Sequence, residues 1–237
     1  MISVCIATYN GAAFIEEQLK SILSQLSSAD EVVISDDGST DGTTDIICRI
    51  KDERIRLLPS HESLGSTGNF FRAIDASKGA IIFLADQDDV WLSGRVERCL
   101  KELETADLVV TDCAVTDEGL NVVYPSLFRL YGLRQGLLHN LLRCGYYGSL
   151  MAMRRSVVER ARPWPENELL KHDWWLGMVA EKTGRVRFVS DKQYVLYRRH
   201  EGTETQVSKS LFKRSNRSLK TKIMARLCMA REIRNKR

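Results

Sequence analysis

The segment Ala80-Ile81-Ile82-Phe83-Leu84-Ala85-Asp86-Gln87-Asp88-Asp89-Val90-Trp91 places a cluster of acidic residues directly after an apolar run. The run is short and rich in branched side chains, which is typical of a buried strand. The three carboxylates that follow repel one another, and they are costly to desolvate unless a positive charge lies among them. A divalent metal would supply that charge, and oxygen ligands favour Mg²⁺ or Mn²⁺ over zinc. A solvated turn or a helix cap is the alternative.

Strand-like and helix-like patterns alternate through the first half of the chain. We expect strands at residues 4–7, 31–35, 55–58, 80–84 and 108–111, and helices at 14–26, 46–50, 68–77 and 95–104. Such alternation predicts an α/β fold with a mostly parallel central sheet flanked by helices. The second half is less regular, with helices expected at 137–142 and from His172, and strands at 186–189 and 194–197.

Polar clusters follow three of the predicted strands. They are Thr8-Tyr9-Asn10, Asp36-Asp37 and residues 86–89. In open α/β sheets, ligands bind in the crevice beyond the carboxyl ends of the strands. Three clusters at equivalent strand ends therefore predict one shared ligand site.

The first two clusters suit a nucleotide. The ring of Tyr9 could stack on a base or a sugar, and the Asp37 carboxylate could accept a hydrogen bond from N3–H of uracil or thymine. Alternatively, Tyr9 is a core aromatic and the Asp36-Asp37 pair forms a turn, in which case Asp36 is the more structural of the two. Neither a P-loop nor a Gly-x-Gly-x-x-Gly turn occurs, so a metal rather than a glycine cradle would hold a diphosphate.

Positive charge is concentrated at the carboxyl end. Residues 207–237 hold eleven Lys or Arg and one acid and carry +10, whereas the whole chain carries +4, which leaves −6 on residues 1–206. A helix from about Leu219 would place five apolar side chains on one stripe: Leu219, Ile223, Leu227, Ala230 and Ile233. A basic amphipathic helix suits an anionic membrane surface. Covering an apolar patch on the body and self-association are alternatives, and no aromatic interleaving supports nucleic-acid binding.

Apolar runs, the first residues and the cysteines indicate where in the cell the protein is found. No apolar run approaches the roughly 18 residues of a membrane span, and the first residues lack a secretory signal pattern. The six cysteines form no Cys-x-x-Cys pair, which predicts reduced core thiols rather than zinc ligands. We therefore expect a cytoplasmic protein, lying peripherally at the inner face of the plasma membrane if the tail binds lipid.

Three motifs in combination resemble family 2 glycosyltransferases of the A-type (GT-A) fold over about residues 1–205. They are residues 3–10 (SVCIATYN), 35–39 (SDDGS) and 86–89 (DQDD). Together with His172-Asp173-Trp174-Trp175, the acidic motif further resembles a bacterial rhamnosyltransferase-like branch. The resemblance implies an inverting enzyme that uses a nucleoside-diphosphate sugar with Mg²⁺ or Mn²⁺. It divides residues 1–206 into a nucleotide-binding half (1–111) and an acceptor-binding half (112–206), followed by the basic helical tail (207–237).

The resemblance also implies roles for single residues. The nucleotide would be held by Thr8, Tyr9, Asn10, Asp37 and Asp86, with Asp86 on the ribose. Asp88 would ligate the metal, and Asp89 would support the site or meet the donor sugar.

Transfer to a hydroxyl group requires a general base, because a hydroxyl is a poor nucleophile. Asp173, at the expected start of a helix, is the candidate, and a helix cap is its alternative role. The family usually has a carboxylate pair here, whereas this chain has His172 in the first position. Trp174 or Trp175 could stack on the apolar face of a sugar ring or belong to the core.

Residues 197–200 (Tyr-Arg-Arg-His) resemble a terminal Tyr-Arg-x-His element of the family. The resemblance places His200 on the metal or the diphosphate and Arg198 on the phosphate or sugar side of the donor. A basic surface loop is the alternative.

These expectations favour a metal-dependent inverting glycosyltransferase of surface polysaccharide synthesis. It would move rhamnose or a related sugar from a dTDP- or UDP-linked donor to a glycan or lipid-linked glycan. A sugar-nucleotide pyrophosphorylase is an alternative, but the chain lacks the early glycine- and arginine-rich phosphate loop. A non-catalytic nucleotide-sugar or membrane-binding module is another, although it would not need a base such as Asp173.

Overall fold

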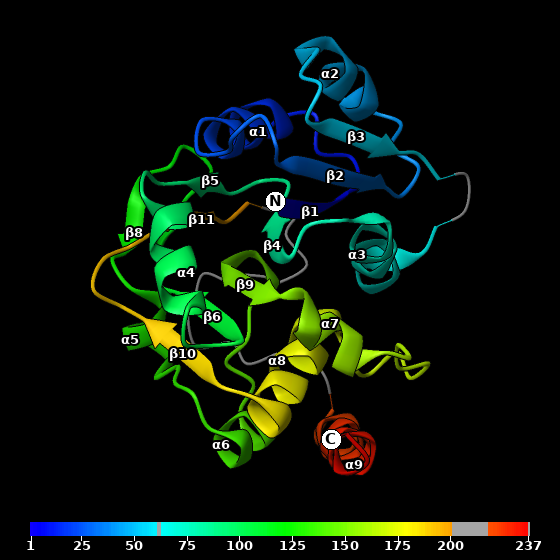
Figure 1. Cartoon of the computed structure of the whole chain (residues 1–237), viewed down its shortest axis with the longest axis vertical. Helices are drawn as coiled ribbons and strands as arrows, with labels where there is room; N and C mark the ends of the chain where they lie inside the picture. Colours follow the sequence, from blue (N-terminus) through cyan, green and yellow to red (C-terminus); the bar gives the residue numbers. More distant parts are fainter. Residues whose placement is uncertain (61–62, 201–217, 237) are drawn as a thin grey trace.

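A computed structural model describes residues 1–60, 63–200 and 218–236 of the chain (Figure 1). Its main sheet has the strand order β10-β6-β9-β4-β1-β2-β3. The strands are β1 (Ile2–Thr8), β2 (Glu31–Asp36), β3 (Ile55–Leu58), β4 (Ile81–Asp86), β6 (Leu108–Thr111), β9 (Met151–Arg154) and β10 (Val186–Val189). Only β9 runs antiparallel to its neighbours in this sheet, so the predicted mostly parallel sheet is confirmed.

A second, smaller sheet has the order β5-β11-β7-β8. Its strands are β5 (Val90–Trp91), β11 (Val195–Arg198), β7 (Cys113–Thr116) and β8 (Val122–Tyr124). The irregular pattern of residues 112–150 gave no indication of β7 and β8. Because β5 comes directly after the acidic cluster, this sheet ties that cluster to β11, which is more than a hundred residues further along the chain.

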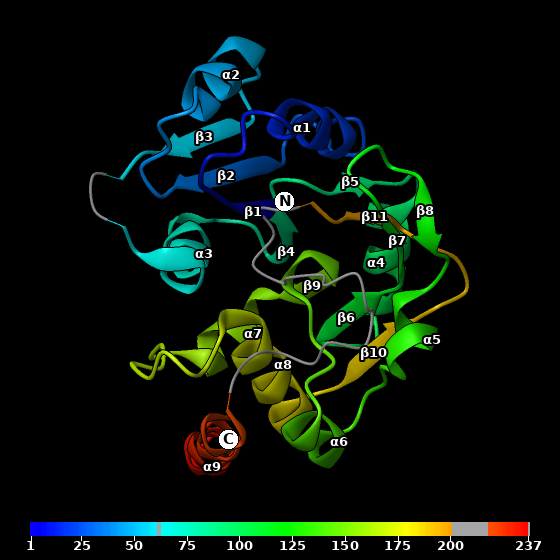
Figure 2. The same cartoon turned by 180° about the vertical axis from the view of Figure 1, so that it is seen from behind.

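Helices pack around the main sheet, as both views show (Figures 1 and 2). They are α1 (Ile15–Leu23), α2 (Thr43–Ile50), α3 (Gly65–Ala76), α4 (Arg95–Leu103), α5 (Leu127–Tyr131), α6 (Leu137–Leu142), α7 (Arg155–Ala161), α8 (His172–Thr183) and α9 (Leu219–Arg234), with a 3₁₀ turn, η1, at Gly148–Leu150. The bounds of α6 and the first residues of α8 and α9 agree with the prediction. By contrast, α3 begins at Gly65, three residues before its expected start, because the polar Gly65-Ser66-Thr67 segment already forms its first turn.

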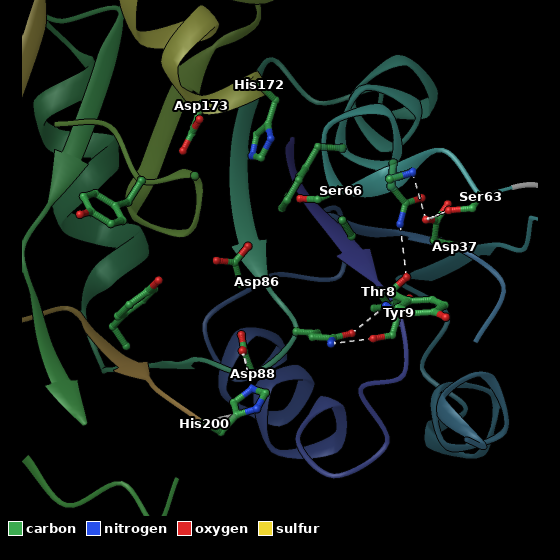
Figure 3. A pocket seen from close by; sticks show the side chains of 18 residues that line it. Thr8, Tyr9, Asp37, Ser63, Ser66, Asp86, Asp88, His172, Asp173 and His200 are labelled. Atoms are coloured by element: carbon green, nitrogen blue, oxygen red, sulfur yellow. Dashed lines mark hydrogen bonds and ion pairs between the residues drawn. The ribbon is translucent and has the colours of Figure 1, made fainter. Parts of the chain in front are cut away.

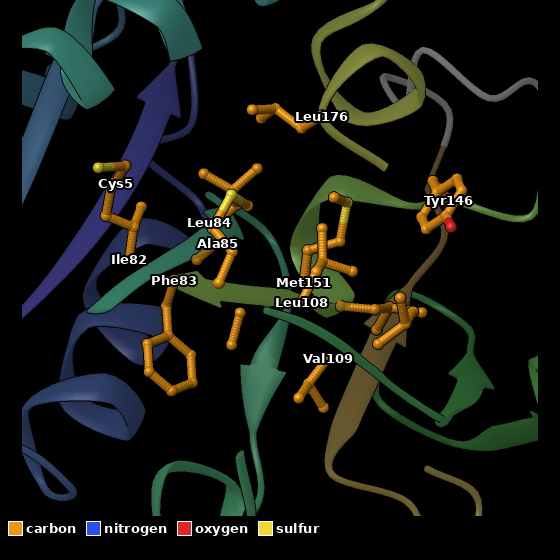
Figure 4. Close-up of a cluster of buried hydrophobic side chains, with 14 of the residues drawn as sticks. Cys5, Ile82, Phe83, Leu84, Ala85, Leu108, Val109, Tyr146, Met151 and Leu176 are labelled. Carbon is orange, nitrogen blue, oxygen red and sulfur yellow. The ribbon is translucent and has the colours of Figure 1, made fainter. Parts of the chain in front are cut away.

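The core lies along the central strands β4, β9 and β6 and the helix α8 (Figure 4). Ile82, Phe83, Leu84 and Met151 are all fully buried there. Parallel strands covered on both faces bury continuous apolar runs, and each fully buried large side chain contributes about 1.5–3 kcal/mol. The apolar run that precedes the acidic cluster therefore anchors that cluster to the buried core of the protein.

The helix α9 packs on the body through a face that shares Ile233 with the predicted stripe. Ala225, Met229 and Ile233 are buried, whereas Leu219, Ile223 and Leu227 of the stripe are exposed. The Lys236 ammonium group donates hydrogen bonds to carbonyl oxygens at the end of α7, which fixes the carboxyl end of α9. Residues 207–217 of the predicted tail lie outside the described residues. Among the helices that the structure describes, none has the length and hydrophobicity needed to cross a bilayer.

Candidate active site

The ends of three parallel strands meet at one edge of the main sheet. Thr8 of β1 lies opposite Asp36 of β2, and Ala7 lies opposite Asp86 of β4. The three polar clusters that follow these strands therefore come together in space, as the sequence predicted. A cavity of about 490 Å³ opens at this edge (Figure 3).

Residues from both halves of the chain line this cavity. Tyr9 and Asp37 lie on one side of it, Asp88 and His200 on another, and His172 and Asp173 towards α8, with Asp86 between Asp88 and Asp173 (Figure 3). The cavity thus offers an aromatic ring, several carboxylates and two imidazoles along its length.

Tyr9 is held by its backbone and presents its ring to solvent. Its N–H donates to Oε1 of Gln87 at 2.9 Å, and its carbonyl accepts from Nε2 of the same amide at 3.0 Å. The residue is 57% exposed, which excludes the core role that was the alternative for Tyr9. Gly11 leaves room for this clamp, since a Cβ there would lie 2.3 Å from Oε1 of Gln87. The sequence pattern does not predict a role for Gln87.

The two aspartates after β2 have different tasks. Asp36 accepts hydrogen bonds from the Thr8 hydroxyl at 2.8 Å and from the backbone N–H groups of Gly38 and Ser39, so it is structural, as predicted. Asp37 lines the cavity, and its carboxylate accepts hydrogen bonds from the chain that enters α3: N–H of Leu64 at 2.6 Å and N–H of Gly65 at 3.1 Å. The oxygen bound by Gly65 also accepts from the Ser63 hydroxyl at 2.8 Å, whereas the oxygen bound by Leu64 has a second lone pair that can still accept a hydrogen bond from a ligand.

Asn10 lies outside the cavity lining, which corrects the prediction that it binds a nucleotide. Its side-chain oxygen accepts from N–H of Thr40 at 2.9 Å, and its own N–H donates to the Ser39 hydroxyl at 2.9 Å. Its φ of 48° is a left-handed conformation that asparagine tolerates better than most residues. Asn10 therefore shapes the loop that carries Tyr9 rather than facing a ligand.

Asp88 and His200 form the charged centre of the cavity. The His200 Nε2 atom lies 2.9 Å from a carboxylate oxygen of Asp88, and each side chain is 14% exposed. Within the described part of the chain, no three His, Cys, Asp or Glu side chains form a complete metal cage. A carboxylate such as Asp88 nevertheless fits a metal that also binds ligand phosphates, which is how Mg²⁺ is usually held, and an imidazole is a further metal-ligating group.

Asp89 and Arg198 are not among the residues that line the cavity, and Asp89 has the supporting position that was one of its two predicted roles. Asp89 is 1% exposed and accepts a hydrogen bond from the backbone N–H of Arg198 at 3.0 Å. Burial, and then the charges of Asp88 and Asp86, hold the pKa of the Asp89 carboxyl well above its ordinary value.

The Arg198 guanidinium is itself buried. It donates to the Asp88 carbonyl at 2.8 Å and to the Glu118 carbonyl at 2.7 Å, and it pairs with the Glu17 carboxylate. Asp89 and Arg198 thus join the acidic cluster to β11 and position Asp88 and His200.

Asp173 lies in the first turn of α8 and lines the cavity. One of its carboxylate oxygens accepts a hydrogen bond from N–H of Trp174 at 2.7 Å. The residue at the cap position of α8 is Lys171, and α8 has no side-chain cap hydrogen bond, so Asp173 does not have the helix-cap role that was its alternative. Its other carboxylate oxygen remains available to meet a ligand.

Trp174 and Trp175 belong to the core, which corrects the prediction that one of them stacks on a sugar. Trp175 is 1% exposed and donates from Nε1 to the Ala161 carbonyl at 3.0 Å. Trp174 donates from Nε1 to the Asn140 carbonyl at 2.9 Å. Both indoles point into the packing around α8 because that helix is buried on nearly all sides.

Several lining residues escaped prediction, among them Asn69 of α3. This fully buried amide donates to the Ser35 carbonyl at 2.7 Å and to the Thr8 carbonyl at 3.3 Å, so it binds the ends of β1 and β2 together. Its position among apolar residues of a helix was the available signal, since a buried amide needs partners. Tyr147 and Gly148, which also line the cavity, come from the stretch without a clear period.

Comparison with known proteins places this geometry in a family. Residues 3–162 match the family described as Glycosyl transferase family 2. The dTDP-rhamnosyl transferase RfbG of Shigella flexneri is 28% identical over 214 residues, which cover 84% of this chain and 72% of RfbG. The UDP-Glc:alpha-D-GlcNAc-diphosphoundecaprenol beta-1,3-glucosyltransferase WfaP of Escherichia coli is 36% identical over 105 residues, 44% of this chain and 42% of WfaP.

Solved structures show the same fold. The S. aureus TarS 1–349 structure in complex with UDP-GlcNAc has a TM-score of 0.69 and 21% identity, and it covers 87% of this chain and 62% of that one. The mannosyltransferase PcManGT of Pyrobaculum calidifontis, in complex with GDP-Man and Mn²⁺, has a TM-score of 0.58 at 22% identity over 80% of this chain and 55% of that one. The predicted GT-A type fold is thereby confirmed. The chain spans less than half of WfaP and about three fifths of the TarS chain.

Acid should destabilise the protein through His172. Burial lowers the pKa of this imidazole below 6.5, against the opposing charge of Asp173, so in acid the unfolded chain takes up a proton before the folded protein does. Stability is therefore present above the unfolded pKa and falls as the pH drops below it, by up to about 1.4 kcal/mol per pH unit for one group. We predict that His172→Phe reduces the loss of unfolding free energy between about pH 7.5 and 5.5, measured by urea denaturation. An unchanged loss would show that other groups cause it.

Proposed function

This chain belongs to glycosyl transferase family 2, and we propose that it transfers a sugar from a nucleoside diphosphate to a glycan or lipid-linked glycan, with inversion at the anomeric carbon, in surface polysaccharide synthesis. One observation carries the proposal. Three groups of side chains line different sides of a single cavity: Tyr9 with Asp37, Asp88 with His200, and Asp173 (Figure 3). Their chemistry suits a nucleotide, a metal and a general base in turn.

The nucleoside occupies the end of the cavity formed by β1 and β2. The exposed ring of Tyr9 stacks on the base or sugar, and Asp37 accepts a hydrogen bond from N3–H of a pyrimidine base. Thr8 supports this end from below, through its hydroxyl on Asp36, and Asp86 at the end of β4 binds the ribose.

Asp88 and His200 would hold Mg²⁺ or Mn²⁺. When bound, the metal would neutralise the charge that develops on the leaving diphosphate. The 2.9 Å contact between the two side chains supports this role, because it brings a carboxylate and an imidazole together in the cavity, and Arg198 binds the backbone carbonyl of Asp88. Ligand phosphates would complete the site.

Asp173 acts as the general base. It removes the proton from an acceptor hydroxyl as that oxygen attacks the anomeric carbon from the side opposite the diphosphate. Asp173 at the start of α8 and Asp88 after β4 both line the cavity, so the two carboxylates reach the same space from separate elements (Figure 3). Attack from one side and departure on the other inverts the anomeric carbon.

The proposed donor is a dTDP- or UDP-linked sugar, with rhamnose as the first candidate. RfbG, whose similarity covers 84% of this chain, is named a dTDP-rhamnosyl transferase, and WfaP is named for a diphosphoundecaprenol-linked acceptor. Asp37 alone does not distinguish uracil from thymine, because both bases present N3–H.

The face formed by α6 and α9 is proposed to bind an anionic membrane, where a lipid-linked acceptor would lie. Both helices lie at the same end of the molecule in both views, and Arg226 of α9 donates hydrogen bonds to the Leu142 carbonyl of α6 (Figures 1 and 2). Exposed apolar side chains come from both helices: Leu138, Leu142, Leu219, Ile223 and Leu227. Exposed basic residues accompany them: Arg143, Lys220, Arg231 and Arg234. Apolar side chains beside cations suit an anionic lipid surface.

Asp173→Asn should abolish transfer and leave nucleotide binding intact. Removal of a general base lowers the rate by about 10²–10⁴-fold, whereas the nucleoside end of the cavity is untouched. Product formation from dTDP-rhamnose and UDP-glucose with a lipid-linked acceptor measures the first effect, and calorimetry with dTDP and UDP measures the second. Substantial transfer by the variant would refute the base assignment.

Asp88→Ala should remove the effect of Mn²⁺ on nucleotide affinity. In the unchanged protein, we expect Mn²⁺ to strengthen dTDP or UDP binding and EDTA to reverse the gain. Asp45→Ala, which alters an exposed carboxylate on α2, is the matched control and should behave like the unchanged protein. If Asp88→Ala keeps the full Mn²⁺ effect, Asp88 is not a ligand.

Ile223→Asp combined with Leu227→Asp should weaken binding to phosphatidylglycerol vesicles, because two charges replace apolar contacts with lipid. Val122→Asp with Val123→Asp, on the exposed part of β8, is the control. Co-sedimentation measures the bound fraction. Equal binding by the α9 variant would overturn the membrane proposal, and a change confined to oligomeric state would point to self-association.

A further inference from the structure

His172 is a buried histidine without an internal partner. The residue is 7% exposed, and both ring nitrogens lack a hydrogen-bond partner among residues 1–60, 63–200 and 218–236. Leaving a buried polar atom unpaired costs about 1–3 kcal/mol. A native protein rarely keeps such groups without a reason, which directs attention to what the ring faces.

The ring forms part of the cavity wall between α3 and η1. It stacks on Phe70 of α3 with the ring centroids 4.1 Å apart and the planes at 24°. On its other side, a Cβ at Gly148 would lie 2.7 Å from Nε2, so the glycine allows the backbone to approach the ring. The remaining edge faces the cavity, beside Asp173 (Figure 3).

Burial keeps this imidazole neutral, since it lowers its pKa. A neutral imidazole has one N–H donor and one acceptor nitrogen. A sugar hydroxyl likewise donates one hydrogen bond and accepts others, so it matches a neutral ring nitrogen in either tautomer. A phosphate group, which only accepts, is a poorer match for an uncharged ring.

We propose that His172 is a specificity-determining residue that hydrogen-bonds a hydroxyl group of the donor sugar. The inference rests on the proposed function, in which the sugar lies between the diphosphate at Asp88 and the base Asp173. His172 borders that space from the α3 side, the same helix whose first turn binds Asp37 at the nucleoside end. The ring therefore lies on the donor side of Asp173 rather than on the acceptor side.

The test separates the affinity for the sugar from the affinity for the nucleotide. Calorimetry compares UDP with UDP-glucose and UDP-N-acetylglucosamine, and dTDP with dTDP-rhamnose, in the presence of Mn²⁺. The Kd of the free diphosphate divided by the Kd of the nucleotide sugar measures how much affinity the sugar adds, and we call this quotient the ratio. His172→Phe keeps the stacking on Phe70 and removes both nitrogens, so we expect the ratio to fall about 5–10-fold while the Kd of the free diphosphate stays unchanged.

Two further variants define the chemistry. His139→Phe, which removes another partly buried histidine with an unpaired nitrogen, on α6 and outside the cavity, should leave the ratio unchanged. His172→Gln retains a donor and an acceptor and should recover part of the ratio. Donor analogues that lack one hydroxyl at a time should identify the hydroxyl group that His172 binds. One analogue should bind the protein with His172 more weakly than the complete donor does. The same analogue and the complete donor should bind His172→Phe with equal affinity.

The assignment would be overturned if His172→Phe had the same ratio as the protein with His172. It would also be overturned if none of these sugars increased the affinity of the protein with His172. If neither UDP nor dTDP binds the unchanged protein, the proposed function itself fails, and the two failures are distinguishable. A merely structural role would alter the melting temperature of His172→Phe without altering the ratio, and this outcome also counts against the assignment.

Discussion

The parallel pairing of β1 with β2 on one side and with β4 on the other is the constraint on which the cavity depends. Because Thr8 lies opposite Asp36 and Ala7 opposite Asp86, the carboxylates after β2 and β4 flank the end of β1. A slip of one residue would turn them to the other face of the sheet. Buried apolar side chains on these strands, such as Phe83, make that slip costly.

The second sheet completes the site by joining distant parts of the chain. The backbone N–H of Arg198 on β11 binds the Asp89 carboxylate, and the Arg198 guanidinium binds the Asp88 carbonyl. This attachment carries His200 to the side chain of Asp88, 112 residues earlier. Neighbouring aspartates thereby acquire different tasks: Asp89 is buried and holds β11, whereas Asp88 faces the cavity.

Sequence patterns predicted the strands well where an apolar run was bounded by polar residues, as at Ile55–Leu58, Leu108–Thr111 and Val186–Val189. They also separated Asp36 from Asp37, since Asp-Gly-Ser has the local chemistry of a turn. They did not predict Gln87 or Asn69, because an amide does not indicate which backbone groups it will meet. The tryptophans of the His-Asp-Trp-Trp motif were likewise ambiguous, since the burial of α8 depends on its neighbours.

The sequence by itself determined the α/β alternation, the acidic strand ends and the resemblance to family 2 glycosyltransferases, because these follow from local periodicity and short motifs. The tertiary structure alone determined which polar side chains face the cavity, which face of α9 is buried, and that neither His172 nitrogen has a hydrogen-bond partner among the described residues. These properties arise from contacts between segments far apart in the chain, such as His172 with Phe70 and Arg198 with Asp89. Local patterns carry no information about such contacts, because burial and hydrogen-bond satisfaction are set by every element that surrounds a side chain.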